Sequence, residues 1–183
     1  IQEGGIDFNN VQYVGINKVK QKQIMTDGDI AVCMSNGSKR LVGKSATLQS
    51  HVISETFTVG AFCSIIRATE KSSHQFVRHL LKSDDYKQQV EFSLAGSAIN
   101  NLKDGDVENY TFLLPPLSEQ KKIASILTSV DEVIETTQKQ IDKLQDLKKA
   151  TMNELLTKGI GHTEFKDSEL GRIPKSWEVV ELK

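Results

Sequence analysis

The chain has 183 residues and a formal net charge of −1, with 26% charged and 38% hydrophobic residues. This length predicts one domain with an extension. The balanced charge argues against a strongly basic, sequence-independent DNA binder but leaves specific binding through a few loops open. No apolar run reaches transmembrane length and no signal peptide is visible, so we expect a cytoplasmic protein without membrane association.

The first 23 residues show no feature typical of a domain start. A short extended segment is expected to end at Gly15. Beyond it, Lys18, Lys20 and Lys22 alternate with other residues and would share one face of a strand. That face is interpreted either as a phosphate contact or as a solvated face that protects a sheet edge.

A polar loop separates two predicted strands. The apolar run 30–34 predicts a buried strand, and 41–48 predicts a second one with a bulge at Gly43. The loop between them reads Ser35-Asn36-Gly37-Ser38-Lys39-Arg40, and its Asn-Gly pair favours a tight turn with positive backbone angles.

The side chains of this loop suit DNA. Lys39 and Arg40 can contact guanine or phosphate, and Asn36 can contact adenine. A polar hairpin tip without any partner explains the same residues equally well. From local chemistry alone the two interpretations stay open.

The next segment predicts further strands and short helices. The β-branched run 56–68 predicts a long strand, whereas Ser72 and Ser73 can cap a helix. A second helix is expected to start at Asp84 or Asp85, and an irregular stretch is expected over 93–102. A short turn or helix over 104–110 and a strand over 111–114 are expected to follow. Regular βαβ crossovers are absent, so the sheet is predicted to be antiparallel or mixed.

A long helix is predicted over 117–158. Two prolines precede it, Ser118 can act as its N-cap, and Gly159 can end it. Its apolar residues recur at coiled-coil spacing, with a slip after Leu144: Ile123, Leu127, Val130, Ile134, Ile141, Leu144, Leu147 and Leu155. A helix about 60 Å long cannot bury this stripe alone, so we expect a second long helix, from this chain or another copy. The alternative is a long surface helix lying across its own domain.

The remaining residues predict no enzyme. Residues 159–175 are expected to be a linker, and the run from Trp177 a strand that opens a new domain. Cys33 and Cys63 are interpreted as buried free thiols, because two distant cysteines make neither a disulfide framework nor a metal site. No glycine-rich nucleotide loop, nucleophile elbow or spaced His/Cys metal set is visible, so we expect no catalytic residue, metal or cofactor in this chain.

Three stretches of the chain carry a resemblance to a known family: the Leu-Pro-Pro-Leu-Ser-Glu-Gln-Lys-Lys-Ile-Ala segment 114–124 with its helix, the segment 155–162, and the tail 169–180. Through them the chain resembles a specificity subunit of a type I restriction–modification system. Asn36-Gly37-Ser38 with 41–43, and the segment 99–102, are weaker signals.

The resemblance implies a non-catalytic subunit whose two target-recognition domains each read half of a bipartite DNA sequence. Two long antiparallel helices would set the spacing between the halves. Modification subunits, which methylate adenine with S-adenosylmethionine, and restriction subunits would be its partners. The alternative is a coiled-coil adaptor or truncated product that assembles with modification subunits without reading DNA.

The residue patterns and the resemblance together predict an α+β fold: a mixed α/β recognition domain followed by a long coiled-coil helix. Residues 1–116 would be the recognition domain without its opening part, 117–158 the spacer, and 159–183 a linker with the opening strand of a next or partner domain. Two copies would pair as a homodimer through the long helix. The predicted DNA contacts are Ser35, Asn36, Gly37, Ser38, Lys39 and Arg40, followed by Gly96, Ser97 and Asn100.

Overall fold

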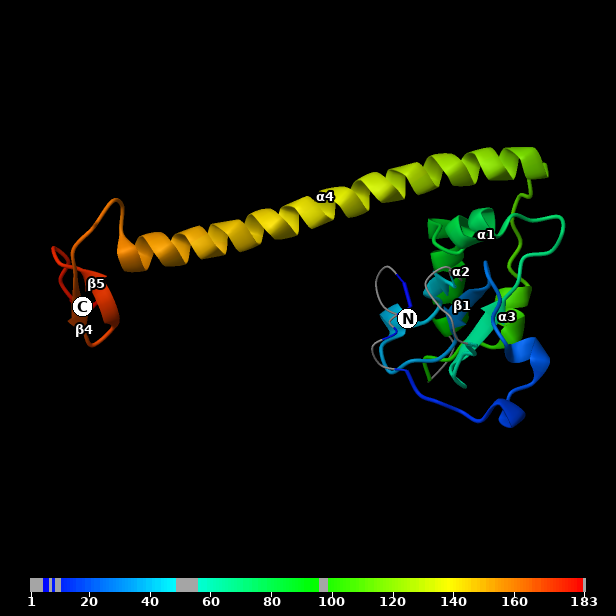
Figure 1. The fold of residues 1–183 in the computed structure, drawn as a ribbon. Helices are drawn as coiled ribbons and strands as arrows, with labels where there is room; N and C mark the ends of the chain where they lie inside the picture. Colours follow the sequence, from blue (N-terminus) through cyan, green and yellow to red (C-terminus); the bar gives the residue numbers. More distant parts are fainter. Residues whose placement is uncertain (1–4, 7, 9–10, 49–55, 96–98, 183) are drawn as a thin grey trace. The chain divides into compact units, whose positions relative to one another are not determined.

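The computed structural model of the protein describes residues 5–6, 8, 11–48, 56–95 and 99–182. Internal contacts divide the chain into two compact units, Ile1–Thr128 and Ser129–Lys183. The division falls within a single long helix (Figure 1). The α+β class expected from the sequence is confirmed, with mixed strands and short helices followed by the long helix.

The first unit is built on a three-stranded antiparallel sheet in the order β2-β1-β3. The central strand β1 (Ile30–Cys33) is buried at all four positions, as its unbroken apolar run predicts. Its neighbours are shorter than expected: β2 spans Ser45–Thr47 and β3 spans Cys63–Ile66. The predicted strands over 41–48 and 56–68 are therefore wrong in extent, because chain reversals at Gly43 and after Gly60 interrupt them.

Alternation along β1 divides the core into two layers. Ile30 and Val32 face a cluster that includes Val77 and Val90, which lie on the first two helices after the sheet. Ala31 faces the other side, where it packs with Met25 and other apolar residues. The strand therefore supports both layers of this unit.

Three short α-helices follow the sheet in the sequence, as predicted: α1 (His74–Leu80), α2 (Asp84–Ala95) and α3 (Asp104–Glu108). Two other predictions are wrong. The lysines at 18, 20 and 22 share no strand face, because η1 (Ile16–Lys18) and η2 (Gln21–Gln23) are single 3₁₀ turns. Residues 111–114 form no strand and are exposed, Leu113 at 92%.

The long helix α4 runs without interruption over Leu117–Lys158. It begins one residue before Ser118, which therefore lies in its first turn and is not its N-cap. Its predicted stop is confirmed, since Gly159 adopts a φ of 69° and accepts no side chain without contacting His162 and Trp177. Most of the predicted apolar stripe is exposed, namely Leu127, Val130, Ile134, Ile141, Leu144, Leu147 and Leu155, while Ile123 is half-buried.

The second unit contains a hairpin where a linker was expected. Strands β4 (Phe165–Ser168) and β5 (Gly171–Pro174) pair antiparallel around a turn that ends at Gly171 with a φ of 96°. The strand expected from Trp177 does not form among the described residues 177–182. Instead the Trp177 ring lies edge-on to His162, with 6.0 Å between ring centroids.

Candidate nucleic-acid interface

The predicted contact loop connects β1 to β2 through a 3₁₀ turn, η3 (Lys39–Leu41). The side-chain oxygen of Asn36 accepts the backbone N–H of Ser38 at 2.9 Å. Gly37 does not have a positive φ, so the predicted tight Asn-Gly turn is wrong. The connection is longer than a two-residue hairpin, and Asn36 shapes it with its side chain rather than with a left-handed backbone.

The structure brings this loop against the segment that contains Asn100. The backbone N–H of Asn36 donates to the Asn100 carbonyl at 3.3 Å, and the Asn100 side chain donates to the Gly37 carbonyl at 3.2 Å. Ser35 also forms a bridge with Asn101. Two stretches that the sequence singled out separately thus form one surface. Gly96 and Ser97 lie outside the described residues.

The polar side chains of the loop differ in what they can still bind. Lys39 and Arg40 are exposed and, within the described part of the chain, have no ion-pair partner. Asn36 and Asn100 already use one side-chain atom each inside the loop. The two cations are therefore free to reach a ligand, whereas the two amides mainly fix the shape of the loop.

One exposed aromatic residue was missed by the sequence interpretation. Phe62 is 69% exposed, and its carbonyl accepts the backbone N–H groups of Met34 and Ser35 at 2.8 and 3.2 Å. Its backbone therefore lies beside the start of the loop, and its side chain is exposed there. It was assigned to the interior of the predicted strand 56–68, and only the nearby Gly60 hinted that the strand is interrupted there.

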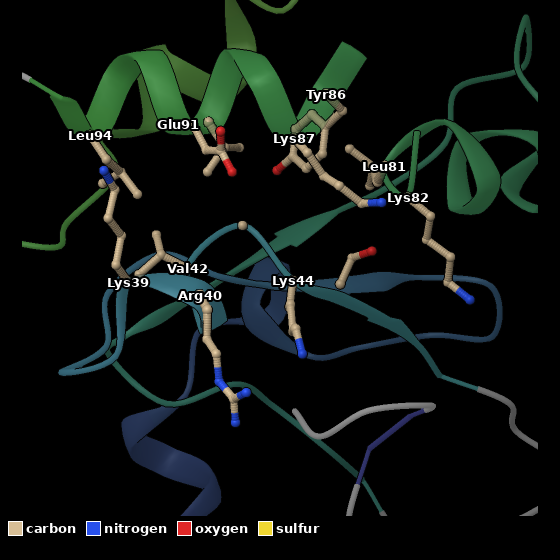
Figure 2. Close-up of a pocket in the computed structure, with 13 residues that line it drawn as sticks. Lys39, Arg40, Val42, Lys44, Leu81, Lys82, Tyr86, Lys87, Glu91 and Leu94 are labelled. Carbon is tan, nitrogen blue, oxygen red and sulfur yellow. The ribbon is translucent and has the colours of Figure 1, made fainter. Parts of the chain in front are cut away.

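A groove of about 720 Å³ lies between the loop side and α2, and we call it the basic groove (Figure 2). Its lining carries five cationic residues and one acidic residue, Glu91. The cations are Lys39, Arg40, Lys44, Lys82 and Lys87. Apolar side chains, among them Val42, Val90 and Leu94, form its floor.

Gly43, which lines this groove, lies close to α2. It has a φ of 81°, and a Cβ placed on it would lie 2.9 Å from both methyl groups of Val90 on α2. Only glycine combines that backbone angle with so close an approach. The loop backbone can therefore lie directly against α2.

An ion pair between a buried aspartate and a half-exposed arginine holds the start of β1. The Asp29 carboxylate is 2% exposed and accepts bonds from Arg67 at 2.8 and 2.6 Å and from the Thr26 backbone at 2.7 Å. Burial alone would raise the pKa of Asp29, but the bonds from Arg67 and Thr26 outweigh it, so the pKa lies below its usual value. This cluster is structural, because its acceptor atoms are already used.

The two cysteines are neighbours in space, although they are distant in the sequence. Cys33 on β1 lies opposite Cys63 on β3, and both are free thiols, as predicted; Cys33 is buried as expected, whereas Cys63 is only partly buried. Burial, together with the neighbouring thiol, raises the pKa of Cys63, which makes its thiol less reactive. The described residues contain no group of three or more His, Cys, Asp or Glu side chains that would hold a metal ion. Among the described helices, none is long and apolar enough to cross a membrane.

Comparison with known proteins shows the family. Residues 3–146 match the family model described as the type I restriction modification DNA specificity domain. The chain belongs to this family. Its specificity-domain relatives include the type I restriction enzyme EcoKI specificity subunit of Escherichia coli K12, which is 34% identical over 81% of this chain and 32% of its own length.

A second specificity-domain relative is the putative type I restriction enzyme MjaX specificity subunit of Methanocaldococcus jannaschii, which is 33% identical over 100% of this chain and 43% of its own length. The chain thus spans less than half the length of these relatives. A solved structure on the assembly and conformational transition of a type I restriction–modification system has the same fold, with a TM-score of 0.58 and 23% identity over 73% of this chain and 33% of that one.

Proposed function

We propose that this chain is a DNA-recognition unit of a type I restriction–modification complex that reads one half of a bipartite target. The proposal rests on the family match together with one observation. The loop around Arg40 and the segment of Asn100 form a single exposed surface, with two cations available for a ligand. The unit is non-catalytic and positions partner subunits that carry the chemistry and S-adenosylmethionine.

The chemistry of the surface assigns different roles to its residues. Arg40 has a free guanidinium, which can donate two parallel hydrogen bonds to guanine O6 and N7. Lys39 beside it suits guanine or phosphate. Phe62 offers an apolar edge for a thymine methyl group. Asn36 and Asn100 support readout by fixing the loop, because their internal bonds occupy part of each amide.

We also propose that two copies of the chain pair through α4, and the exposed apolar stripe of this helix supports that pairing. A helix of 42 residues with apolar side chains such as Leu144 and Leu147 exposed is stabilised by pairing with another long helix. The relatives are more than twice as long as this chain. Two copies joined antiparallel through α4 would reproduce a two-domain layout, and α4 would then set the distance between half-sites.

The central experiment is co-expression with a cognate modification subunit, followed by mapping of methylated adenines. We expect a bipartite palindromic motif, since two identical copies read two identical half-sites. Arg40→Ala should weaken specific binding by about 1–3 kcal/mol and relax the motif at one position. Arg172→Ala, an exposed arginine of the second unit, is the control. A stable complex that methylates no motif would contradict DNA reading and favour an assembly adaptor.

The role of α4 as a spacer has its own test. Inserting seven residues, about two helical turns, between Val130 and Leu144 keeps the stripe in phase and lengthens the helix by about 10 Å. We expect a longer gap between unchanged half-sites. Light scattering tests pairing directly, and a monomer at tens of micromolar concentration would exclude the homodimer.

A further inference from the structure

The basic groove carries a charge that the rest of the chain does not share. Five of its lining residues are cationic and one is acidic, whereas the whole chain has a formal net charge of −1. The groove therefore favours a negatively charged ligand. Nothing in the loop's proposed base contacts accounts for Lys44, Lys82 or Lys87.

The cations are spread along the groove and do not converge on one point (Figure 2). Lys39 extends toward Leu94 at one end, and Lys82 and Lys87 lie at the opposite end. Arg40 and Lys44 follow the loop side and point away from α2. A single small anion requires donors that meet at one place, whereas an extended polyanion is matched by charges distributed along a track.

The floor of the groove narrows the class of polyanion further. Val42, Val90 and Leu94 give the space between the cations an apolar surface. Deoxyribose presents carbon atoms between successive phosphates, so a sugar–phosphate backbone alternates apolar and anionic parts in the way that the groove does. The volume of about 720 Å³ accommodates such a segment.

The groove is also continuous with the candidate recognition loop. Lys39 and Arg40 belong to both, because η3 leaves the loop tip and forms the groove wall. We infer that the basic groove holds the sugar–phosphate backbone of the same DNA duplex whose bases the loop contacts. This inference rests on the proposed function and adds a sequence-independent contact that fixes the register of the loop on DNA.

Lys87 shows how this contact is made. It pairs with Asp84 at 3.0 Å, and both side chains are mostly exposed. Such a surface pair contributes little to stability, so a phosphate can replace Asp84 as the partner of Lys87. Glu91 is the one acidic residue in the lining, and its charge repels the polyanion. Removing that charge should therefore raise the affinity for DNA, whereas removing a lysine charge should lower it.

The test uses the complex with its modification subunit and the double variant Lys82→Gln/Lys87→Gln. Both lysines are exposed, and glutamine retains most of the side-chain stem. Dissociation constants are measured for target and non-target duplexes over a range of salt concentrations. We expect both duplexes to be weakened by the same factor, a salt slope lower by about 2, and an unchanged methylation motif. Glu91→Gln should tighten both duplexes, and Lys166→Gln on β4 is the matched control.

The outcomes separate this inference from the proposed function. Unchanged affinity and salt slope in the double variant, with Arg40→Ala still losing target binding, would overturn the groove inference alone. Loss of target preference in the double variant would assign the lysines to base reading instead. Saturable binding of inorganic phosphate by the wild-type complex, lost in the double variant, would make the groove a small-anion site. Absence of any DNA binding by the wild-type complex would overturn both proposals.

Discussion

The side-chain oxygen of Gln120 accepts the backbone N–H of Ser73 at 2.9 Å, which joins the first turn of α4 to the start of α1. The amide nitrogen of Gln120 donates to the carbonyls of Lys71 and Pro115 at 3.0 and 2.8 Å. Gln120 is completely buried; its bond to Ser73 is buried, and its bonds to Lys71 and Pro115 are partly buried. The proline-rich segment that carries the family resemblance therefore has a structural role: it places this glutamine where it fixes the long helix to the first unit.

Gln120→Ala should destabilise the first unit by about 2–3 kcal/mol. The change leaves one buried N–H and two carbonyls without their partner, and each unsatisfied group carries a desolvation penalty. Urea denaturation monitored by circular dichroism measures the loss. Gln138→Ala on the same helix is the control, because Gln138 is exposed and bonds only to Asp142. Equal effects of the two variants would show that the Gln120 bonds do not fix the helix.

Gly43→Ala should destabilise the protein by about 2–4 kcal/mol. Alanine disfavours the φ of 81°, and its Cβ would lie 2.9 Å from the methyl groups of Val90. Gly37→Ala is the matched control, since Gly37 has open space around it and no positive φ. Thermal denaturation compares the two. A Gly43→Ala/Val90→Ala variant should lose less than the sum of the single losses, because the smaller side chain removes the clash. Strict additivity would show that the contact with Val90 is not the cause.

The sequence predicted helices better than strands, for a physical reason. Helix signals are local: the apolar period and Gly159 define α4, and the acidic first turn and apolar face define α2. Strand ends depend on which partner is available across the sheet. The run 56–68 is rich in apolar and β-branched residues, yet only Cys63–Ile66 pairs with β1, because β1 itself is only four residues long.

The candidate site was predicted in part. Loop composition singled out 35–40, and the segment of Asn100 was chosen separately, but their direct contact depends on the fold. Lys82 and Lys87 were not selected, because they belong to the helical part of the sequence and meet η3 only in three dimensions. The two cysteines are thirty residues apart in the sequence, and only the strand register puts them opposite each other.

Asp29→Asn should cost about 1.5–3 kcal/mol at neutral pH, because the partly buried bonds from Arg67 lose their charged acceptor. The lowered pKa of Asp29 means that the unfolded state binds its proton first as pH falls. The stabilisation is therefore complete above the unfolded value near 3.8 and is lost as pH falls through the folded pKa. Urea titrations across this acidic range measure it. The Asp29→Asn variant should lose less free energy of unfolding than the wild type as pH falls. The control Asp167→Asn, at an exposed position, should show the same pH dependence as the wild type.

Tyr86→Phe should change stability most at alkaline pH. The Tyr86 hydroxyl is buried and has no hydrogen-bond partner among the residues that the structure describes, and burial, with a contribution from Tyr110, raises its pKa to about 12. Unfolding lets the phenol ionise from about pH 10, so the unfolded state binds fewer protons than the folded state between about pH 10 and 12. Stability therefore falls over that window, by roughly 2–3 kcal/mol for this one group.

Tyr86→Phe removes this loss, and near neutral pH it should stabilise the protein by up to about 1 kcal/mol by eliminating an unpaired buried hydroxyl. Urea denaturation near pH 8 and near pH 11 measures both effects, and the ultraviolet absorbance of the phenolate reports ionisation directly. Tyr13→Phe is the control because Tyr13 is 86% exposed. If Tyr86→Phe lost as much stability as the wild type between the two pH values, the hydroxyl would not be buried without a partner. A lower stability of the variant near neutral pH would indicate that the hydroxyl has a polar partner, such as a bound water molecule, in solution.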